Sequence, residues 1–382
     1  MSVRVLRSIF VASLAASAGL AVAPSALAGS DGGTTGAMSG AVPGVLAIAA
    51  EPGAMPDAGA AMAAGDAVDG VSGWRFQVDN DRFILPARND GGYTGGWRFD
   101  HGFARDDTPS WLEPLRLAAG SLLGGPATLN ASAGQLAYTP RDATLAAPQP
   151  DERPWAAFLY GALSAHRLSD GLWRSVELKL GVLGPAALGR QAQTVVHKLT
   201  NSDTPAGWGH QLRARTAVQV EALASWRALE AGPVGIDIDG GLVAGTLRNY
   251  AQAGVGLVLG ARAPRLPALS PNVHDRVVFD AAALRALGDD GWHGLTAFAH
   301  WGAQRYATNS FITGATYGER PDVDFRRDVT TLSAGLHWAF ARDWSLSYVA
   351  TRRSADYVSR NPGVGEDSER WGGVVLTHVC GC

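Results

Sequence analysis

Beyond Gly70 the chain is dominated by an alternation of apolar and polar residues with a period of two. In the segment WRSVELKLGVLG, Val176 and Leu178 fall on one face of an extended chain, and Glu177 and Lys179 fall on the other. The same division recurs through HQLRARTAVQVEA. A period of two residues predicts β-strands with one apolar and one polar face. These strands are longer than the about five or six residues usual in globular sheets.

Twelve segments share this pattern and predict twelve strands. They fall near residues 73–80, 93–103, 128–139, 155–166, 172–183, 209–222, 233–246, 249–262, 291–304, 327–340, 343–356 and 371–381. An even number of strands of about ten residues, apolar outside and polar inside, is typical of an outer-membrane barrel. Closing the sheet pairs every backbone group and leaves no edge. We therefore expect an all-β fold, a transmembrane antiparallel β-barrel of about twelve strands.

Aromatic residues recur toward the ends of these segments, as expected for the girdles at the two membrane interfaces. They are Trp74, Trp97, Tyr138, Trp155, Trp173, Trp292 and Tyr348. A soluble β-sandwich would show a similar alternation and stays open as the alternative. The length of the strands favours the barrel, and so does the secretory signal peptide predicted at the N-terminus.

One segment departs from the period of two. In AALGRQAQTVVHKLTNSDTPAGW the apolar residues recur at helical spacing, at Leu188, Ala192, Val195, Val196 and Leu199. The spacing predicts a short amphipathic helix in an extracellular loop between the fifth and sixth strands. Asn201 and Pro205 should end it.

The N-terminal part of the chain carries no strand pattern. Residues 1–28 combine two arginines, an apolar run and a small-residue cleavage site, which predicts a secretory signal peptide. Residues 29–72 are rich in Ala and Gly with almost no charge, and we expect a flexible leader, with a short helix through Ala58 to Ala64 as the alternative. The barrel domain should then span residues 73–382.

Charge and composition exclude several classes of function. A net charge of −3 argues against nucleic-acid binding, which needs a basic face. No apolar run of about 18 residues follows the signal segment, so a helical membrane span is not expected. The two cysteines, at positions 380 and 382, are too few for a disulfide framework.

Oxygen-bearing side chains gather where the first predicted strand ends. Asp79, Asn80 and Asp81 lie at its rim, and Thr94 begins the next strand, on the face shared with Arg98. A hairpin connection should bring these groups together. Carboxylate, amide and hydroxyl oxygens suit Ca²⁺ better than a transition metal. The alternative is that these residues only form the turn, since Asp and Asn dominate turns.

His197 lies on the flank of the predicted loop helix, with acidic Asp203 shortly after it. A nearby carboxylate can orient a histidine ring and raise its basicity, so His197 is a candidate general base. A structural or solvated histidine is the alternative.

Several motifs, in this order, resemble those of a known family. They are VDNDRF, DGGYTGGWRFD, GQLAYTP, DERPWAAFLYG, LGVLGPAALGRQAQTVVHKL, PAGWGHQL and YATNSFITG. The chain is similar here to the outer-membrane lipid A 3′-O-deacylases, twelve-stranded barrels that remove an acyl chain from lipid A. The resemblance covers most of the chain from Trp74 onward.

The resemblance implies an active site and a cofactor. Its residues would be Asn80, Asp81, Thr94, His197 and Asp203, although Ser202 could take the place of Asp203. A Ca²⁺ held by Asp81, with Asn80 and Thr94, would stabilise the oxyanion, while His197 takes a proton from the attacking water. The family's loop lysine has no counterpart here, and Arg141 is the candidate for a phosphate contact.

The resemblance also implies partners and location. The substrate would be lipid A of lipopolysaccharide, hydrolysed at its ester-linked 3′ acyl chain. We expect a monomer in the outer membrane of a Gram-negative bacterium, surrounded by lipid, with its site toward the outer leaflet. The alternative is a barrel without catalysis, either a lipopolysaccharide-binding or structural protein or a pore.

Overall fold

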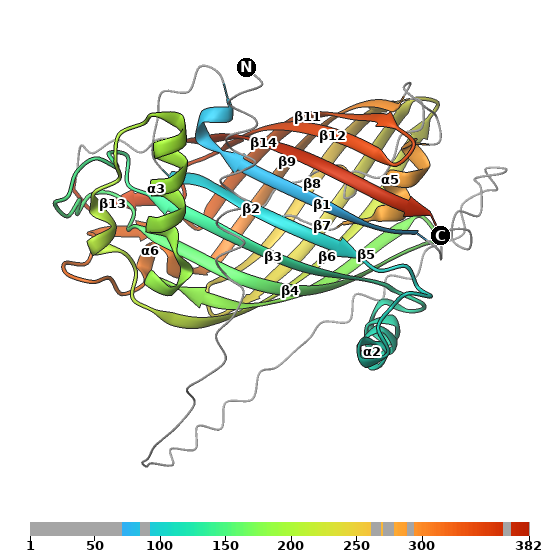
Figure 1. The fold of residues 1–382 in the computed structure, drawn as a ribbon, viewed down its shortest axis with the longest axis horizontal. Helices are drawn as coiled ribbons and strands as arrows, with labels where there is room; N and C mark the ends of the chain where they lie inside the picture. The colour runs from blue at the N-terminus through green and yellow to red at the C-terminus, as the bar shows by residue number, and fades with distance from the viewer. Residues whose placement is uncertain are drawn as a thin grey trace, which may run out of the picture.

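The fold is a closed antiparallel β-barrel of twelve strands (Figure 1). The computed structural model describes residues 71–84, 92–260, 269, 279–288, 294–361 and 368–381. The barrel strands are β1 (Val71–Asn80), β2 (Gly92–Gly102), β3 (Thr128–Thr139), β4 (Ala156–Ser169), β5 (Leu172–Leu183), β6 (Arg215–Ala231), β7 (Val234–Gly245), β8 (Arg248–Gly260), β9 (Gly294–Asn309), β11 (Asp328–Ala341), β12 (Trp344–Arg353) and β14 (Glu369–Gly381). Pairing of β1 with β14 closes the sheet, so the predicted fold is confirmed.

The sixth strand differs most from its predicted bounds. It begins at Arg215 rather than near residue 209, because the preceding residues belong to a loop. Residues Gly207–His210 form a short 3-10 turn, η4, and the backbone N–H of Leu212 donates to Trp155 O instead of to a barrel neighbour. The alternation continues through this loop because Leu212 is buried against aromatic side chains.

The predicted division of faces holds along β5. Glu177 and Lys179 are buried inside the barrel, whereas Leu178 and Leu180 are exposed on its outer surface. The aromatic girdle is only partly as predicted. Tyr138 and Trp173 are buried on the lumen face, Trp155 is buried under a loop, and Trp292 lies outside the described residues. Large aromatic residues on the outer surface include Trp226, Trp301, Trp338 and Tyr348.

Paired charges fill the middle of the lumen. Arg98 donates to Asp100 at 2.8 Å and to Glu177 at 2.6 Å, and all three side chains are buried. Arg75 also binds Asp100, and Lys179 donates to Glu221. Buried charges of this kind require partners, because an isolated one is costly to desolvate.

An apolar cluster closes one end of the lumen. Leu284 of helix α5 (Ala281–Gly288) and Phe279, two residues before the helix begins, lie among lumen-facing side chains. Arg75 lies over the Phe279 ring, 5.4 Å from its centroid. Side chains therefore fill the barrel interior both in the middle of the lumen and at this end.

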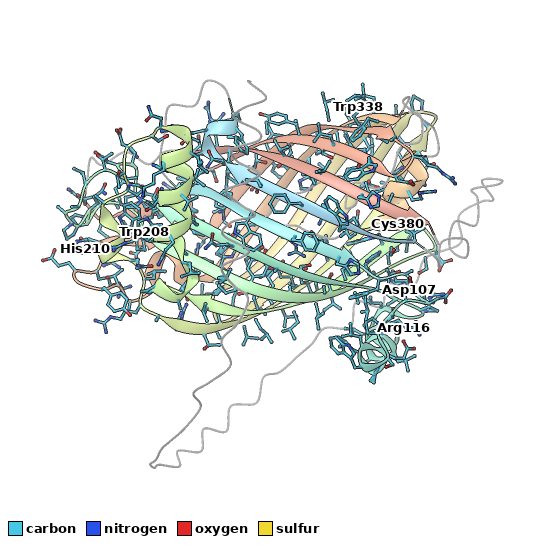
Figure 2. The ribbon with its side chains drawn as sticks, viewed as in Figure 1. Asp107, Arg116, Trp208, His210, Trp338 and Cys380 are labelled. Carbon is cyan, nitrogen blue, oxygen red and sulfur yellow. The ribbon has the colours of Figure 1, made fainter. Side chains whose placement is uncertain are left out.

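The two ends of the barrel differ. At one end, strands are joined by the tight turns 170–171, 232–233 and 342–343, and β1 begins and β14 ends there (Figure 1). Figure 2 places Cys380 at this end, and Trp208 and His210 at the other. Short turns are typical of the periplasmic side and long loops of the extracellular side.

The long loops carry the remaining elements of the extracellular end. They are η1 (Asp81–Phe83), η3 (Pro185–Ala187), α3 (Gly189–Thr200), η4, α6 (Ser310–Thr313) and a small two-stranded sheet of β10 (Val323–Phe325) and β13 (Tyr357–Ser359). Helix α3 confirms the predicted loop helix, and it ends where Asn201 adopts the left-handed conformation.

The periplasmic end carries one further helix that the sequence pattern did not predict. It is α2 (Glu113–Leu123), preceded by the 3-10 turn η2 (Ser110–Leu112). Within the described ranges, no helix is both long and apolar enough to cross a membrane.

Replacing Leu178 by arginine should impair assembly, because Leu178 faces outward from the middle of β5. A cation at the bilayer midplane costs roughly 2–4 kcal/mol. Urea titration of the barrel refolded in phospholipid vesicles would measure this loss. The same change at Ala231, the exposed last residue of β6 at the periplasmic end, is the control. Equal stability of the two variants would contradict the assignment of the outer face.

Candidate functional site

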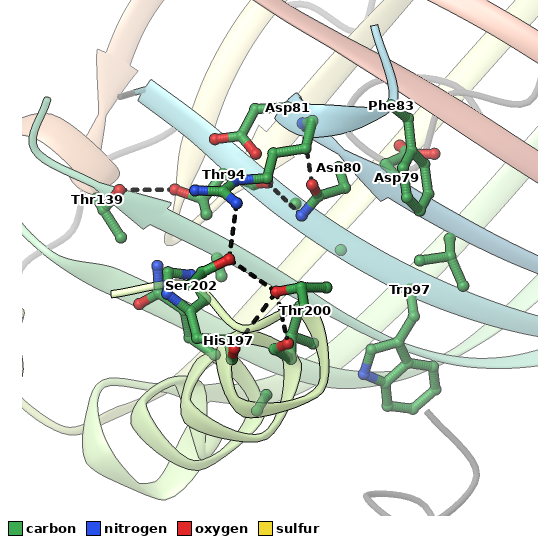
Figure 3. Close-up of a pocket in the computed structure, with 18 of the residues that line it drawn as sticks. Asp79, Asn80, Asp81, Phe83, Thr94, Trp97, Thr139, His197, Thr200 and Ser202 are labelled. Atoms are coloured by element: carbon green, nitrogen blue, oxygen red, sulfur yellow. Dashed lines mark hydrogen bonds between the residues drawn. The ribbon is translucent and has the colours of Figure 1, made fainter. Parts of the chain in front are cut away.

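A pocket of about 510 Å³ lies between α3 and the outer surface of the barrel at its extracellular end (Figure 3). The loop that carries α3 packs against this outer surface. Trp155 and Trp208 form a cluster there with Ala157, and Val182 packs against it. Ala157 and Val182 alternate along their strands with lumen-facing residues, so the pocket lies outside the lumen, on the side of the wall that faces lipid.

The end of β1 directs three consecutive side chains to different places. Asp79 points inward, where Gln77 donates to it at 2.8 Å. Asn80 lies on the outer face and caps η1, its Oδ1 accepting from the N–H of Arg82 at 2.9 Å. Asp81 begins that turn, and its buried side chain lines the pocket. Asn80 therefore has the turn-forming role named above as the alternative, and it lines the pocket as well.

The alternation along β2 predicted that Thr94 shares a face with Arg98, and this prediction is wrong. The register of β2 and β3 shifts between Tyr93 and Gly95, so Thr94 is the additional residue of a β-bulge. Its hydroxyl shares a 2.7 Å hydrogen bond with Thr139, and both residues line the pocket. The bulge thus moves Thr94 to the outer face, beside Asn80, whose amide donates to Thr94 O at 3.3 Å.

His197 reaches the pocket from α3. Its Nδ1 lies 2.5 Å from the backbone oxygen of Asp203. A carbonyl oxygen can only accept a hydrogen bond, so Nδ1 must carry the proton and Nε2 of a neutral ring holds the lone pair. Asp203 therefore contacts His197 through its backbone, and its side chain is not among the residues that line the pocket.

A chain of polar contacts joins α3 to the barrel wall. Arg82 donates to Ser202 Oγ at 2.6 Å, and Ser202 shares a 2.8 Å hydrogen bond with Thr200 (Figure 3). The sequence reasoning did not include Arg82 in the site. Its position directly after Asn80 and Asp81 was a usable signal, because the turn that presents Asp81 also presents its neighbour.

Arg141, the candidate for a phosphate contact, lies outside this pocket, and so does Arg153 in the same loop. Arg141 forms a 3.7 Å ion pair with Glu152 in its own loop and is partly exposed. Arg153 is fully buried and donates to Glu369 at 2.5 Å. Burial alone would lower the pKa of Arg153, but the charges of Asp356 and Glu369 outweigh it and raise that pKa.

The rest of the pocket wall is largely apolar. It is contributed by Val78, Phe83, Trp97, Ala137, Ala143, Ala192 and Val196. On the same helix, Val195 and Leu199 are exposed. A polar edge formed by Asn80, Asp81, Thr94 and His197 thus borders a surface suited to an alkyl chain.

A family model described as "Outer membrane protein LpxR" matches residues 46–378. The chain belongs to the LpxR family. The structure of LpxR from Salmonella typhimurium has the same fold, with a TM-score of 0.64 and 17% sequence identity, over 80% of this chain and 99% of that one. A comparison with curated proteins gave no match.

The translocator domain of the autotransporter NalP from Neisseria meningitidis is less similar to this LpxR family member. It has a TM-score of 0.39 and 11% identity, over 81% of this chain and 88% of that domain. Family membership and the closed barrel together place the protein in the outer membrane.

The donor set of this LpxR family member is compatible with Ca²⁺, although it is small. Among the described residues no group of three or more His, Cys, Asp or Glu side chains could hold a metal ion. The pocket instead combines the carboxylate of Asp81 with the oxygens of Asn80 and Thr94. An amide oxygen has two lone pairs, so Asn80 Oδ1 can accept from Arg82 and still bind a cation. Ca²⁺ takes six to eight oxygens, so most positions would remain for water and substrate.

Gly95 should be intolerant of a side chain. A Cβ there would lie 2.6 Å from Asp79 O and 3.3 Å from Asn80 Nδ2. Gly95→Ala should therefore lower the free energy of unfolding by about 1–3 kcal/mol, as overpacking does. Gly161→Ala, at an open position on the outer face, is the control, because its Cβ would meet only Ser132 O at 3.8 Å. Equal stabilities in urea titrations would contradict the close approach at Gly95.

Proposed function

We propose that this protein is a lipid A deacylase that hydrolyses the ester-linked 3′ acyl chain of lipopolysaccharide. The observation that carries the proposal is the placement of His197. Its Nδ1 donates to Asp203 O, which leaves Nε2 as a base in a pocket on the lipid-facing side of the wall. A soluble substrate would not need a site in that position, whereas a lipid can enter it from the membrane.

The residues then have distinct roles. His197 Nε2 takes a proton from water, and the water oxygen attacks the ester carbonyl carbon. When the carbon–oxygen bond to the sugar breaks, the imidazolium returns its proton to the leaving sugar oxygen. The products are a free fatty acid and a hydroxyl group on the sugar. The carbonyl of Asp203 keeps the ring in the required tautomer throughout.

Asp81, Asn80 and Thr94 would hold a Ca²⁺ that supplies Lewis-acid stabilisation of the developing negative charge on the carbonyl oxygen. The hydrogen bond from Asn80 Nδ2 to Thr94 O also holds these two residues in position at the bulge. The apolar wall would accept the acyl chain, which keeps the ester at the polar edge.

Charged groups of the substrate would contact arginines at two positions, one inside the pocket and one outside it. Arg82 presents a guanidinium inside the pocket, where it also binds Ser202. Arg141 stays a predicted contact for a phosphate that lies outside the pocket, since its loop is at the same end of the barrel. Guanidinium groups suit phosphate because they bind it bidentately.

Mass spectrometry of lipid A tests the reaction. Expression of the protein in a Gram-negative outer membrane should remove the mass of the 3′ acyl group, and His197→Ala should slow this removal by roughly 10²–10⁴-fold, the usual contribution of a general base. His101→Ala, on the outer surface near the periplasmic end, is the control and should retain activity.

Two results would count against this assignment. Undiminished deacylation by a folded His197→Ala variant would remove His197 as the base. Unchanged lipid A with the folded wild-type barrel would favour the alternative of a lipopolysaccharide-binding or structural barrel.

Chelation tests the cofactor. EGTA should abolish deacylation by the purified protein in mixed micelles, and added Ca²⁺ should restore it, whereas the smaller Mg²⁺ should not. Asp81→Asn should raise the Ca²⁺ concentration needed for half-maximal activity, because it removes the anionic ligand. Asp170→Asn is a matched control, since Asp170 has a φ of 50° in a periplasmic turn, a conformation that Asn tolerates. Full activity after chelation would exclude Ca²⁺ from the reaction.

A further inference from the structure

Helix α2 lies on the outer surface of the barrel, at the periplasmic end (Figure 1). One face of it is buried against the wall. Leu112, Ala119 and Leu123 form a cluster with Leu129 and Ala165, side chains that alternate with lumen-facing ones on β3 and β4. The helix therefore covers part of the surface that the barrel would otherwise present to lipid.

A second face of α2, one residue or about 100° around the helix from the buried one, is apolar and exposed. Trp111, Leu115, Ala118 and Leu122 follow a spacing of four, three and four residues, which places them in one stripe along the helix. Trp111 is 73% exposed and Leu122 is 71% exposed. We refer to these four residues as the α2 stripe. An exposed apolar stripe of this kind indicates a partner surface.

The α2 stripe continues the apolar outer surface of the barrel. Val176 on β5 packs against the α2 cluster, and Leu178, two residues further along the same face, is exposed to the bilayer. Trp226, on the adjacent strand β6, is half exposed at this end and pairs in register with Leu172. The helix thus sits where the lipid-facing surface meets the periplasmic aromatic girdle, and lipid is the partner already present there.

Basic side chains flank the helix at the level expected for lipid headgroups. Arg167 donates to the carbonyl of Leu123 at the C-terminus of α2, and Arg174 lies beside it against Gly124. Arg116 is paired with Glu113 on the helix itself. An apolar face with basic side chains beside it is typical of helices that lie in the membrane interface.

We propose that α2 is an interfacial helix seated in the periplasmic leaflet of the outer membrane, with the α2 stripe among phospholipid acyl chains. The helix would widen the barrel's contact with that leaflet on the side of β3–β5. This is the same side on which α3 and the pocket lie at the other end, so the wall that carries the site is the one held at both interfaces.

Fluorescence quenching tests the position of the α2 stripe. In a Cys380→Ser, Cys382→Ser background, Ala118→Cys and Leu122→Cys would each carry a polarity-sensitive fluorophore. The chain would be refolded in phosphatidylethanolamine–phosphatidylglycerol vesicles with iodide on both sides of the bilayer. Both labels should be quenched by lipids brominated on their acyl chains and protected from iodide. The same label at Ala231→Cys, at the exposed periplasmic end of β6, should show the reverse.

Two results would overturn the proposal. Iodide quenching at position 118 as strong as at 231, without quenching by brominated lipid, would place the helix in water. Protection from both quenchers, with emission that depends on the ratio of protein to lipid, would show that a second copy of the chain covers the stripe.

Discussion

The architecture depends on one constraint, the complete pairing of backbone groups in a closed sheet within a lipid bilayer. Closure leaves no edge, and the pleat sends successive side chains to opposite sides of the wall. Every strand must therefore satisfy two surroundings at once, the lumen and the membrane. Charged residues such as Arg98 and Glu177 can be tolerated at mid-wall only because each finds its counterpart across the lumen.

The same constraint explains how polar groups reach the outer side at the extracellular rim. A regular strand would direct Thr94 into the lumen with Arg98. The bulge at Thr94 interrupts the alternation where β2 begins, and so brings a hydroxyl to the lipid side. Asn80 already lies on that side, as the last outward-facing residue of β1. One irregular position and one regular position together build this part of the pocket edge.

The sequence allowed the twelve strands and the loop helix to be predicted, since their periods of two and 3.6 residues are strong signals. It could not show the side of the wall on which Thr94 lies, because a bulge follows from pairing with β3 and has no local pattern. Arg82 was overlooked for a similar reason. Its partner, Ser202, is distant in sequence, and only the folded loop brings the two together. Helices α2 and α5 were missed because α2 carries apolar residues around most of its circumference and α5 has only 8 residues, so neither shows the clear stripe that marks α3.

The placement of the pocket on the outer wall has a kinetic consequence. A ligand that enters from the membrane diffuses in two dimensions, so its encounter rate with the pocket depends on its mole fraction in the leaflet rather than on its bulk concentration. The tether from Arg82 through Ser202 to Thr200 then limits how far α3 can move from the wall. Entry would then depend on the lateral diffusion of lipids past a nearly fixed opening. Diluting the ligand with other lipids would lower the rate at which it reaches the pocket, just as dilution of a dissolved substrate lowers its rate of encounter with a soluble enzyme.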